Sequence, residues 1–208
     1  WTYKDWIRTL WTDESTFSTT GFGHRPWVLC RPEEEFHPDC IDETWESGRE
    51  SVIIWGGFCG EMKSELQLQK DGSETQTSIL DSKTYIYKIL IPHLVPLYQA
   101  MGGAIEWCMI IEDGATYHSS QITSRWRKIF SVIRMDWTAH SPDLNPIENY
   151  YPELYLMIGD VNVVKKTIVE AITHYWELLD PKVFDALAGS MVDRIETIIK
   201  ADRWYTKY

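Results

Sequence analysis

The chain has 208 residues, of which 44% are hydrophobic and 25% charged, an ordinary balance for one well-buried globular domain. There is no signal peptide and no apolar run near the ~20 residues of a membrane span, so we expect no membrane association. The net charge of −11 argues against a protein that holds nucleic acid by its overall charge.

The four cysteines include no CxxC pair. Cys30, His37 and Cys40 form a loose cluster that fits no usual zinc spacing, so reduced structural thiols are favoured and a zinc site is the alternative. Reduced thiols predict a reducing compartment, the cytosol or the nucleus. Seven of the eleven tryptophans lie beside apolar runs and are predicted to be core, with base stacking as the alternative: Trp6, Trp11, Trp27, Trp55, Trp107, Trp126 and Trp137.

The first half of the chain predicts mostly strands. Residues 1–7 end a helix, Arg8–Asp13 reads as a buried strand, and Thr16–Gly23 is rich in turn residues. Three more strands are predicted over Trp27–Cys30, Ser51–Phe58 and Leu66–Gln69, the last two pairing as a hairpin. Gly56 and Gly57 predict a bulge or a close backbone approach.

The second half alternates helices and strands. Helical spacing predicts a helix over Ser82–Ala100 that Pro92 and Pro96 bend or break. The apolar run Trp107–Ile111 predicts a buried strand that delivers Asp113 at its carboxyl end. After it, we predict a helix capped by Ser119–Ser120 and running to about Phe130, and then a strand over Val132–Trp137. A rigid loop over Ser141–Pro146 leads to a helix start that carries Glu148. Two more helices are predicted, over Val163–Leu179 and from Pro181 to about Ala201.

This order of elements predicts an α/β fold, a mixed sheet with helices on its faces. We expect residues 1–160 to form the core and residues 161–208 a C-terminal helical extension of the same domain. Sites in such sheets gather at strand ends, which would bring Asp13, Asp113 and Glu148 together. Close carboxylates repel unless a cation lies between them, and two divalent ions roughly 3.5–4 Å apart could drive phosphoryl transfer.

Four segments give the chain a resemblance to the catalytic domain of mariner-superfamily DDE transposases: WTDES (Trp11–Ser15), SVIIWGGF (Ser51–Phe58), EDGATYH (Glu112–His118) and SPDLNPIEN (Ser141–Asn149). They stand in the family's order, with 34 residues between Asp113 and Glu148. The ending IIKADRWYTKY (Ile198–Tyr208) is similar to that of fungal relatives.

The resemblance implies an RNase H-like fold with a five-stranded mixed sheet, and an enzyme that cuts double-stranded DNA at transposon ends and joins them to target DNA at TA. It implies that Asp13, Asp113 and Glu148 are catalytic and bind two Mg²⁺ (or Mn²⁺) ions. It also implies a homodimer acting in the nucleus. His118, which could orient Asp113 or touch a phosphate, and Asp143, Asn145 and Asn149, which shape the loop, are possible supporting residues.

Several features depart from the family's pattern. Gly114 stands where many relatives have Asn, and Tyr150–Glu153 replaces the usual Leu-Trp. Pro152 could tilt the helix that carries Glu148. The chain opens at Trp1 without an initiator Met or a helix-turn-helix module, so we expect it to be a fragment of a longer protein.

Two alternatives therefore stay open. The chain could be a decayed or host-adopted domain acting as a non-catalytic DNA or protein interaction module, or a general nuclease that does not join strands. Basic clusters at Arg125, Arg127 and Lys128 and at Lys165 and Lys166 are candidate phosphate contacts, with solvated helix faces as the alternative.

Overall fold

A computed structural model of the chain describes residues 1–18, 51–68, 81–137, 144–149, 154 and 165–200. Its centre is a five-stranded mixed sheet in the order β3-β2-β1-β5, with β4 also paired to β2. The strands are β1 (Thr9–Ser18), β2 (Ser51–Cys59), β3 (Met62–Lys63), β4 (Gln67–Leu68) and β5 (Met109–Ile111). β1 runs antiparallel to β2 and parallel to β5, which confirms the predicted mixed sheet.

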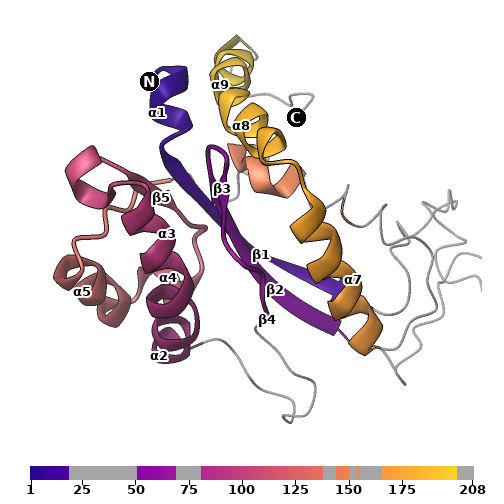
Figure 1. Cartoon of the computed structure of the whole chain (residues 1–208). Coiled ribbons are helices and arrows are strands. Elements are labelled where there is room, and N and C mark those ends of the chain that lie inside the picture. Colours follow the sequence, from indigo (N-terminus) through magenta and orange to yellow (C-terminus); the bar gives the residue numbers. More distant parts are fainter. Residues whose placement is uncertain (19–50, 69–80, 138–143, 150–153, 155–164, 201–208) are drawn as a thin grey trace, which may run out of the picture.

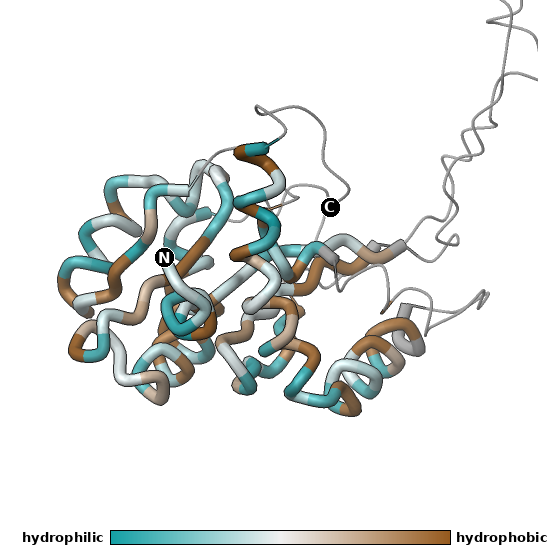
Figure 2. The backbone as a smooth tube through the Cα atoms, turned by 90° about the horizontal axis from the view of Figure 1, so that it is seen from above, coloured by the Kyte–Doolittle hydropathy of each residue, from teal (hydrophilic) through white to brown (hydrophobic). Residues whose placement is uncertain are grey.

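Helices cover both faces of the sheet (Figure 1). On one face lie α2 (Ser82–Tyr85), the π-helix η3 (Ile86–Leu94), α3 (Val95–Ala100), α4 (Thr116–Ser119) and α5 (Gln121–Ile129). On the other lie α7 (Lys165–Leu178), α8 (Pro181–Gly189) and α9 (Met191–Lys200), while α1 (Tyr3–Trp6) leads into β1. Figure 2 shows hydrophilic and hydrophobic residues alternating around these helices, as one-sided burial requires.

Two hydrophobic cores result from the alternation of side chains along the strands. Leu10 packs with Tyr85 and Leu90 on the α2–α5 side, whereas its neighbour Trp11 packs with Trp176 and other residues on the α7–α9 side. Both Leu10 and Trp11 are fully buried, because successive residues of a strand point to opposite faces. The run of apolar residues before Asp13 thus fills both cores at once.

The C-terminal helices share a core with the sheet. Trp176 donates a hydrogen bond from Nε1 to the Ser64 carbonyl (2.8 Å), and the rings of Phe58 and Phe184 lie 4.8 Å apart. This packing is compatible with a single domain, and the boundary at residue 160 stays a prediction. Among the described helices, none combines the length and the apolar composition of a membrane span.

The helix predicted over Ser82–Ala100 is confirmed, but the prolines do not break it. Asp81 begins it by accepting a hydrogen bond from the Thr84 amide (2.7 Å), and Pro92 lies inside the π-helical part. A π-helix widens the turn, so the missing N–H of a proline and its ring are easier to accommodate there. Pro96 lies at the junction of η3 and α3, directly after the π-helical part.

Several predicted boundaries were wrong. β1 continues to Ser18, so residues 16–18 are strand and not turn. The strand predicted over Val132–Trp137 is reduced to one parallel β-bridge between Ile110 and Arg134. In this bridge the Ile110 amide donates to the Ile133 carbonyl, and the Met135 amide donates to the Ile110 carbonyl. The helix predicted from Pro181 to Ala201 is two helices, α8 and α9, separated at Ser190.

Trp107 is not a core residue. It follows the short 3₁₀-helix η4 (Gly103–Glu106) in a left-handed conformation with φ of 56°, and 76% of its surface is exposed. The strand begins only at Met109, after that turn. The predicted strand Trp27–Cys30, the Cys30–His37–Cys40 cluster, Asp143 and Pro152 lie outside the described residues.

Candidate metal site between β1 and the end of β5

The parallel pairing of β1 and β5 places two acids side by side. Trp11 pairs with Ile111, so Asp13 and Asp113 each follow the same rung by two residues. Thr12 strengthens this pairing by donating from Oγ1 to the Ile111 carbonyl (2.8 Å), across 99 positions of sequence. Asp113 therefore lies just past the end of β5, beside Asp13 in the middle of β1 and not at its end.

Glu148 reaches the same site from the 3₁₀-helix η6 (Pro146–Asn149). Its neighbour Ile147 is fully buried in the core that contains Trp11, and Asn145 Nδ2 lies 3.5 Å from the Thr12 carbonyl. The Glu148 amide donates to the Asn145 carbonyl (3.1 Å), so the loop turns Glu148 back toward β1. The Asn145 side chain thus contacts β1 and not its own loop, and the side chain of Asn149 is outside the described part.

The acidic side chains at this site influence one another's pKa. Burial raises the pKa of Asp13 to about 9, and the charges of Glu148, Glu14 and Asp113 add to the rise. Burial also raises the pKa of Glu148; a hydrogen bond with Asp13 opposes the rise and Asp113 adds to it. Asp13 is only 7% exposed, so water does little to relieve this repulsion.

Besides the acids Asp13 and Glu148, Asp113 has partners in the segment that follows it. Its Oδ1 accepts a hydrogen bond from the Ala115 amide (2.9 Å) and lies 2.6 Å from Nδ1 of the buried His118. His118 Nε2 lies 3.3 Å from Oε1 of Glu14. The hydrogen bond from His118 is the main cause that lowers the pKa of Asp113.

His118 is the cation among these partners. Burial alone would lower its pKa, but hydrogen bonds with Asp113 and Glu14 and the nearby negative charges raise it to about 10. An imidazolium thus joins the two carboxylates at neutral pH. This arrangement agrees with the prediction that His118 could orient Asp113.

Sequence reasoning missed Glu14. Atoms of Glu14, Asp113 and His118 all lie within 4.8 Å of one another, a grouping that could hold a metal ion. Within the described residues, Asp13, Asp113 and Glu148 do not form an equally tight group. Asp13 and Glu14 are adjacent and point to opposite faces of β1, so nothing in their local sequence shows that Glu14 meets His118.

The residues present fit a hard divalent cation. The donors of Asp13, Asp113 and Glu148 are all carboxylate oxygens, the ligands that Mg²⁺ and Mn²⁺ prefer. The raised pKa values of Asp13 and Glu148 mean that these carboxyl groups lack the positive charge that would keep both ionised. A bound cation would supply that charge.

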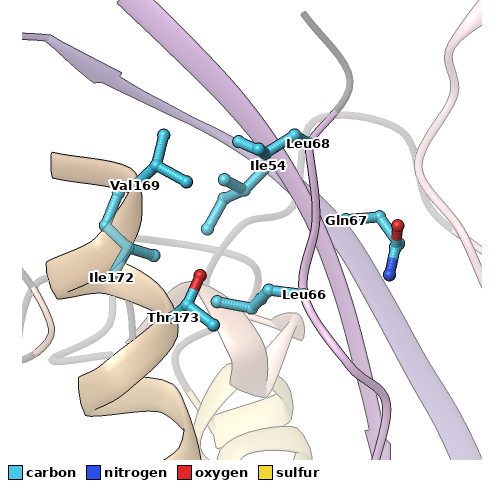
Figure 3. A pocket seen from close by; sticks show the side chains of 7 residues that line it. All are labelled: Ile54, Leu66, Gln67, Leu68, Val169, Ile172 and Thr173. Atoms are coloured by element: carbon cyan, nitrogen blue, oxygen red, sulfur yellow. The ribbon is translucent and has the colours of Figure 1, made fainter. Parts of the chain in front are cut away.

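The hollow shown in Figure 3 is not part of this site. It encloses about 160 Å³ between β2, β4 and α7. Its lining consists of Ile54, Leu66, Gln67, Leu68, Val169, Ile172 and Thr173. None of these side chains ionises, so the hollow offers no acid to a metal.

The prediction that Arg125, Arg127 and Lys128 form a basic surface cluster was wrong for Arg127. Arg127 is 6% exposed and forms an ion pair with the buried Glu112, whereas Arg125 and Lys128 on the same helix are exposed. The side chains of Lys165 and Lys166 lie outside the described part of the chain. Arg127 is therefore not available for a phosphate.

Replacing Asp13 with Asn should stabilise the metal-free protein. Folding raises the pKa of Asp13 to about 9, so the folded state binds this proton more tightly than the unfolded chain does. The native state then loses stability as the pH rises from about 4 through about 9. At about pH 8, Asp13→Asn should raise the free energy of unfolding by about 1–2 kcal/mol.

Urea denaturation in a chelator, at about pH 5 and about pH 8, measures this effect. The variant should show a flatter pH dependence than the wild type. Asp136→Asn, at an exposed acid, is the control and should leave the pH dependence unchanged. An equally steep loss of stability in Asp13→Asn and the wild type would contradict the assigned pKa.

The whole chain aligns with transposases of nematodes. The Tc1 transposase of Caenorhabditis elegans is 26% identical over 209 residues, covering all of this chain and 73% of that protein. The Tcb2 transposase of Caenorhabditis briggsae is 26% identical over 213 residues with the same coverage. No family model matches the chain.

Solved structures show the same fold. The catalytic domain of the Mos1 mariner transposase matches with a TM-score of 0.67 at 12% identity, covering 97% of this chain and 85% of that one. The Mos1 mariner paired-end complex with Mn matches with a TM-score of 0.72 at 12% identity, and there the chain spans 57% of the Mos1 chain. The chain is thus similar over its whole length to Tc1-type transposases, and its described part has the RNase H-like fold of the Mos1 mariner catalytic domain.

Proposed function

We propose that the chain is the catalytic domain of a DNA transposase that cleaves transposon-end DNA and transfers the cut strand into target DNA, with divalent metal ions as cofactors. The observation that carries this proposal is the convergence of Asp13, Asp113 and Glu148 from three distant segments at one site, where each alters the proton affinity of at least one other. The Tc1 and Tcb2 relatives and the Mos1 fold support it.

Asp13, Asp113 and Glu148 would hold two Mg²⁺ or Mn²⁺ ions. Bound there, the ions would supply Lewis-acid activation of a water or a 3′-hydroxyl and stabilisation of the leaving oxygen of an in-line displacement. Mos1 catalytic-domain structures contain Mg and Mn, which supports the choice of cation. Within the protein, His118 and the Ala115 amide keep the Asp113 carboxylate ionised and oriented, and Ile147 and Asn145 hold the segment of Glu148.

The partner is double-stranded DNA, both transposon ends and a target at TA. Mos1 has been captured in a paired-end complex with its left transposon end and in a strand-transfer complex. We extend this to a homodimer that acts in the nucleus on two ends. Because the net charge is −11, most of the affinity for DNA would come from local contacts or from a further module of the full protein.

The test is an assay of the full-length protein on DNA that carries the element's terminal repeats. Cleavage at the ends and joined products should form with Mg²⁺ or Mn²⁺ and disappear when a chelator is added. Cleavage without joined products would identify a general nuclease. No cleavage with either ion would favour the non-catalytic interaction module.

A further inference from the structure

A buried ionic cluster lies directly behind the segment that carries Asp113. Its centre is Glu112, the residue before Asp113, whose side chain is fully buried. One carboxylate oxygen, Oε1, accepts a hydrogen bond from the Tyr85 hydroxyl (2.7 Å). The other, Oε2, pairs with Nη2 of Arg127 and with Nε of Arg134 (3.2 Å).

The same two arginines also hold backbone carbonyls at both ends of the segment Asp113–His118. Arg134 donates from Nη2 to the Asp113 carbonyl (2.9 Å), and Arg127 donates from Nη2 to the His118 carbonyl (2.7 Å). Inside the segment, the Ala115 amide donates to Asp113 Oδ1 and the His118 amide to the Ala115 carbonyl. The segment is therefore tied at its first residue, at its last residue and across its middle.

Stability alone is a weak explanation for such a cluster. Removing two arginines and a glutamate from water is costly, and apolar side chains of similar size often stabilise a core as well or better. What apolar side chains cannot do is donate to two particular carbonyls. The planar guanidinium group has several donors in fixed directions, so one arginine can hold a carboxylate and a carbonyl together.

The position of the cluster connects it with the site. Metal ligands have to be held to within about half an ångström of their working geometry, and side chains beyond the ligands supply that precision. Asp113 is the half-exposed acid of the site, with 54% of its side chain accessible, so its own packing does little to fix it. The hydrogen bonds from the two arginines to the Asp113 and His118 carbonyls hold this segment in place of side-chain packing.

We infer that Arg127 and Arg134, joined through Glu112, are positioning residues that fix the Asp113–His118 segment and thereby hold Asp113 ready for a cation. In this role they act on Asp113 through the segment, by the hydrogen bonds to the Asp113 and His118 carbonyls. The inference rests on the proposed function as far as the cation is concerned. The fixing of the segment is a separate property and can be measured without any metal.

The decisive variant is Arg134→Met in the full-length protein, because Arg134 is partly exposed and methionine keeps the apolar stem. Amide hydrogen exchange in metal-free protein should be at least about tenfold faster in residues 114–118, with the exchange of β1 unchanged. The affinity for Mn²⁺, measured by calorimetry, should fall at least about tenfold. Arg125→Met, at an exposed arginine on α5, is the matched control and should change neither quantity.

Each outcome decides one part. Wild-type exchange in residues 114–118 of Arg134→Met would overturn the inference, and so would faster exchange with an unchanged Mn²⁺ affinity. If the wild-type protein binds no Mn²⁺, the proposed function fails, and the exchange result alone decides whether the arginines fix the segment. If Arg134→Met unfolds, Tyr85→Phe, which removes a single hydrogen bond from Glu112, should give the same local increase in exchange.

Discussion

Asp113→Asn is expected to slow metal-dependent DNA cleavage by at least about 10³-fold, which corresponds to about 4 kcal/mol of transition-state stabilisation. Asparagine has the same shape as aspartate, and its Oδ1 can still accept the hydrogen bond that the Ala115 amide now donates to Asp113. What it lacks is the charge that His118 keeps in place at neutral pH. The cleavage assay described above, with the full-length protein and saturating Mg²⁺, measures the loss.

The control for this experiment is Asp136→Asn. Asp136 is an exposed acid beyond the bridge formed by Arg134, and it has no assigned part in the site. Its substitution removes one negative charge from the surface, as Asp113→Asn does from the site, and should leave the rate within about twofold. An Asp113→Asn protein that keeps more than about a tenth of the wild-type rate would remove Asp113 from the chemistry.

The second large effect concerns stability. Trp176→Ala should lower the free energy of unfolding by about 3–5 kcal/mol. The indole is 2% exposed, lies 5.3 Å from the ring of Phe184, and donates to the Ser64 carbonyl. It also lies so close to Gly56 that a β-carbon there would be 3.3 Å from Cη2, so the cavity left by alanine has a rigid wall.

Urea denaturation of Trp176→Ala beside Trp107→Ala separates burial from residue type. Trp107 is 76% exposed, and its loss should cost less than about 0.5 kcal/mol. Equal losses in the two variants would mean that α7 does not pack on the sheet as described. A large loss only at Trp176 would show that the C-terminal helices stabilise the catalytic core.

The sequence predicted the strands that carry the acids because those strands are continuous apolar runs. Leu10 and Trp11 before Asp13, and Ile110 and Ile111 before Asp113, are buried on both faces of the sheet. Glycines at 56 and 57 predicted a close approach or a bulge. The structure shows the close approach: the pairing of β1 and β2 continues without interruption from Asp13–Gly56 to Thr12–Gly57.

The surroundings of the acids could not be predicted, because they depend on which side of an element faces which neighbour. Arg127 and Lys128 are adjacent in sequence, yet the rotation between successive helical residues buries one and exposes the other. Glu112 contacts Tyr85 of α2, Arg127 of α5 and Arg134. A local sequence pattern does not predict contacts between residues so far apart in the chain. Glu14 was missed for the same reason, since its partner His118 is brought to it only by the packing of α4.

The pairing of β1 with β5 also bears on how the protein folds. Because these parallel strands join positions 99 residues apart in sequence, their contacts have a high contact order and close a long loop, which makes them slow to form. A nascent or truncated chain that ends before β5 can pair β1 with β2, but it lacks the strand that places Asp113 beside Asp13. On the proposed function, a chain without β5 therefore lacks part of the cation site and should not cleave DNA.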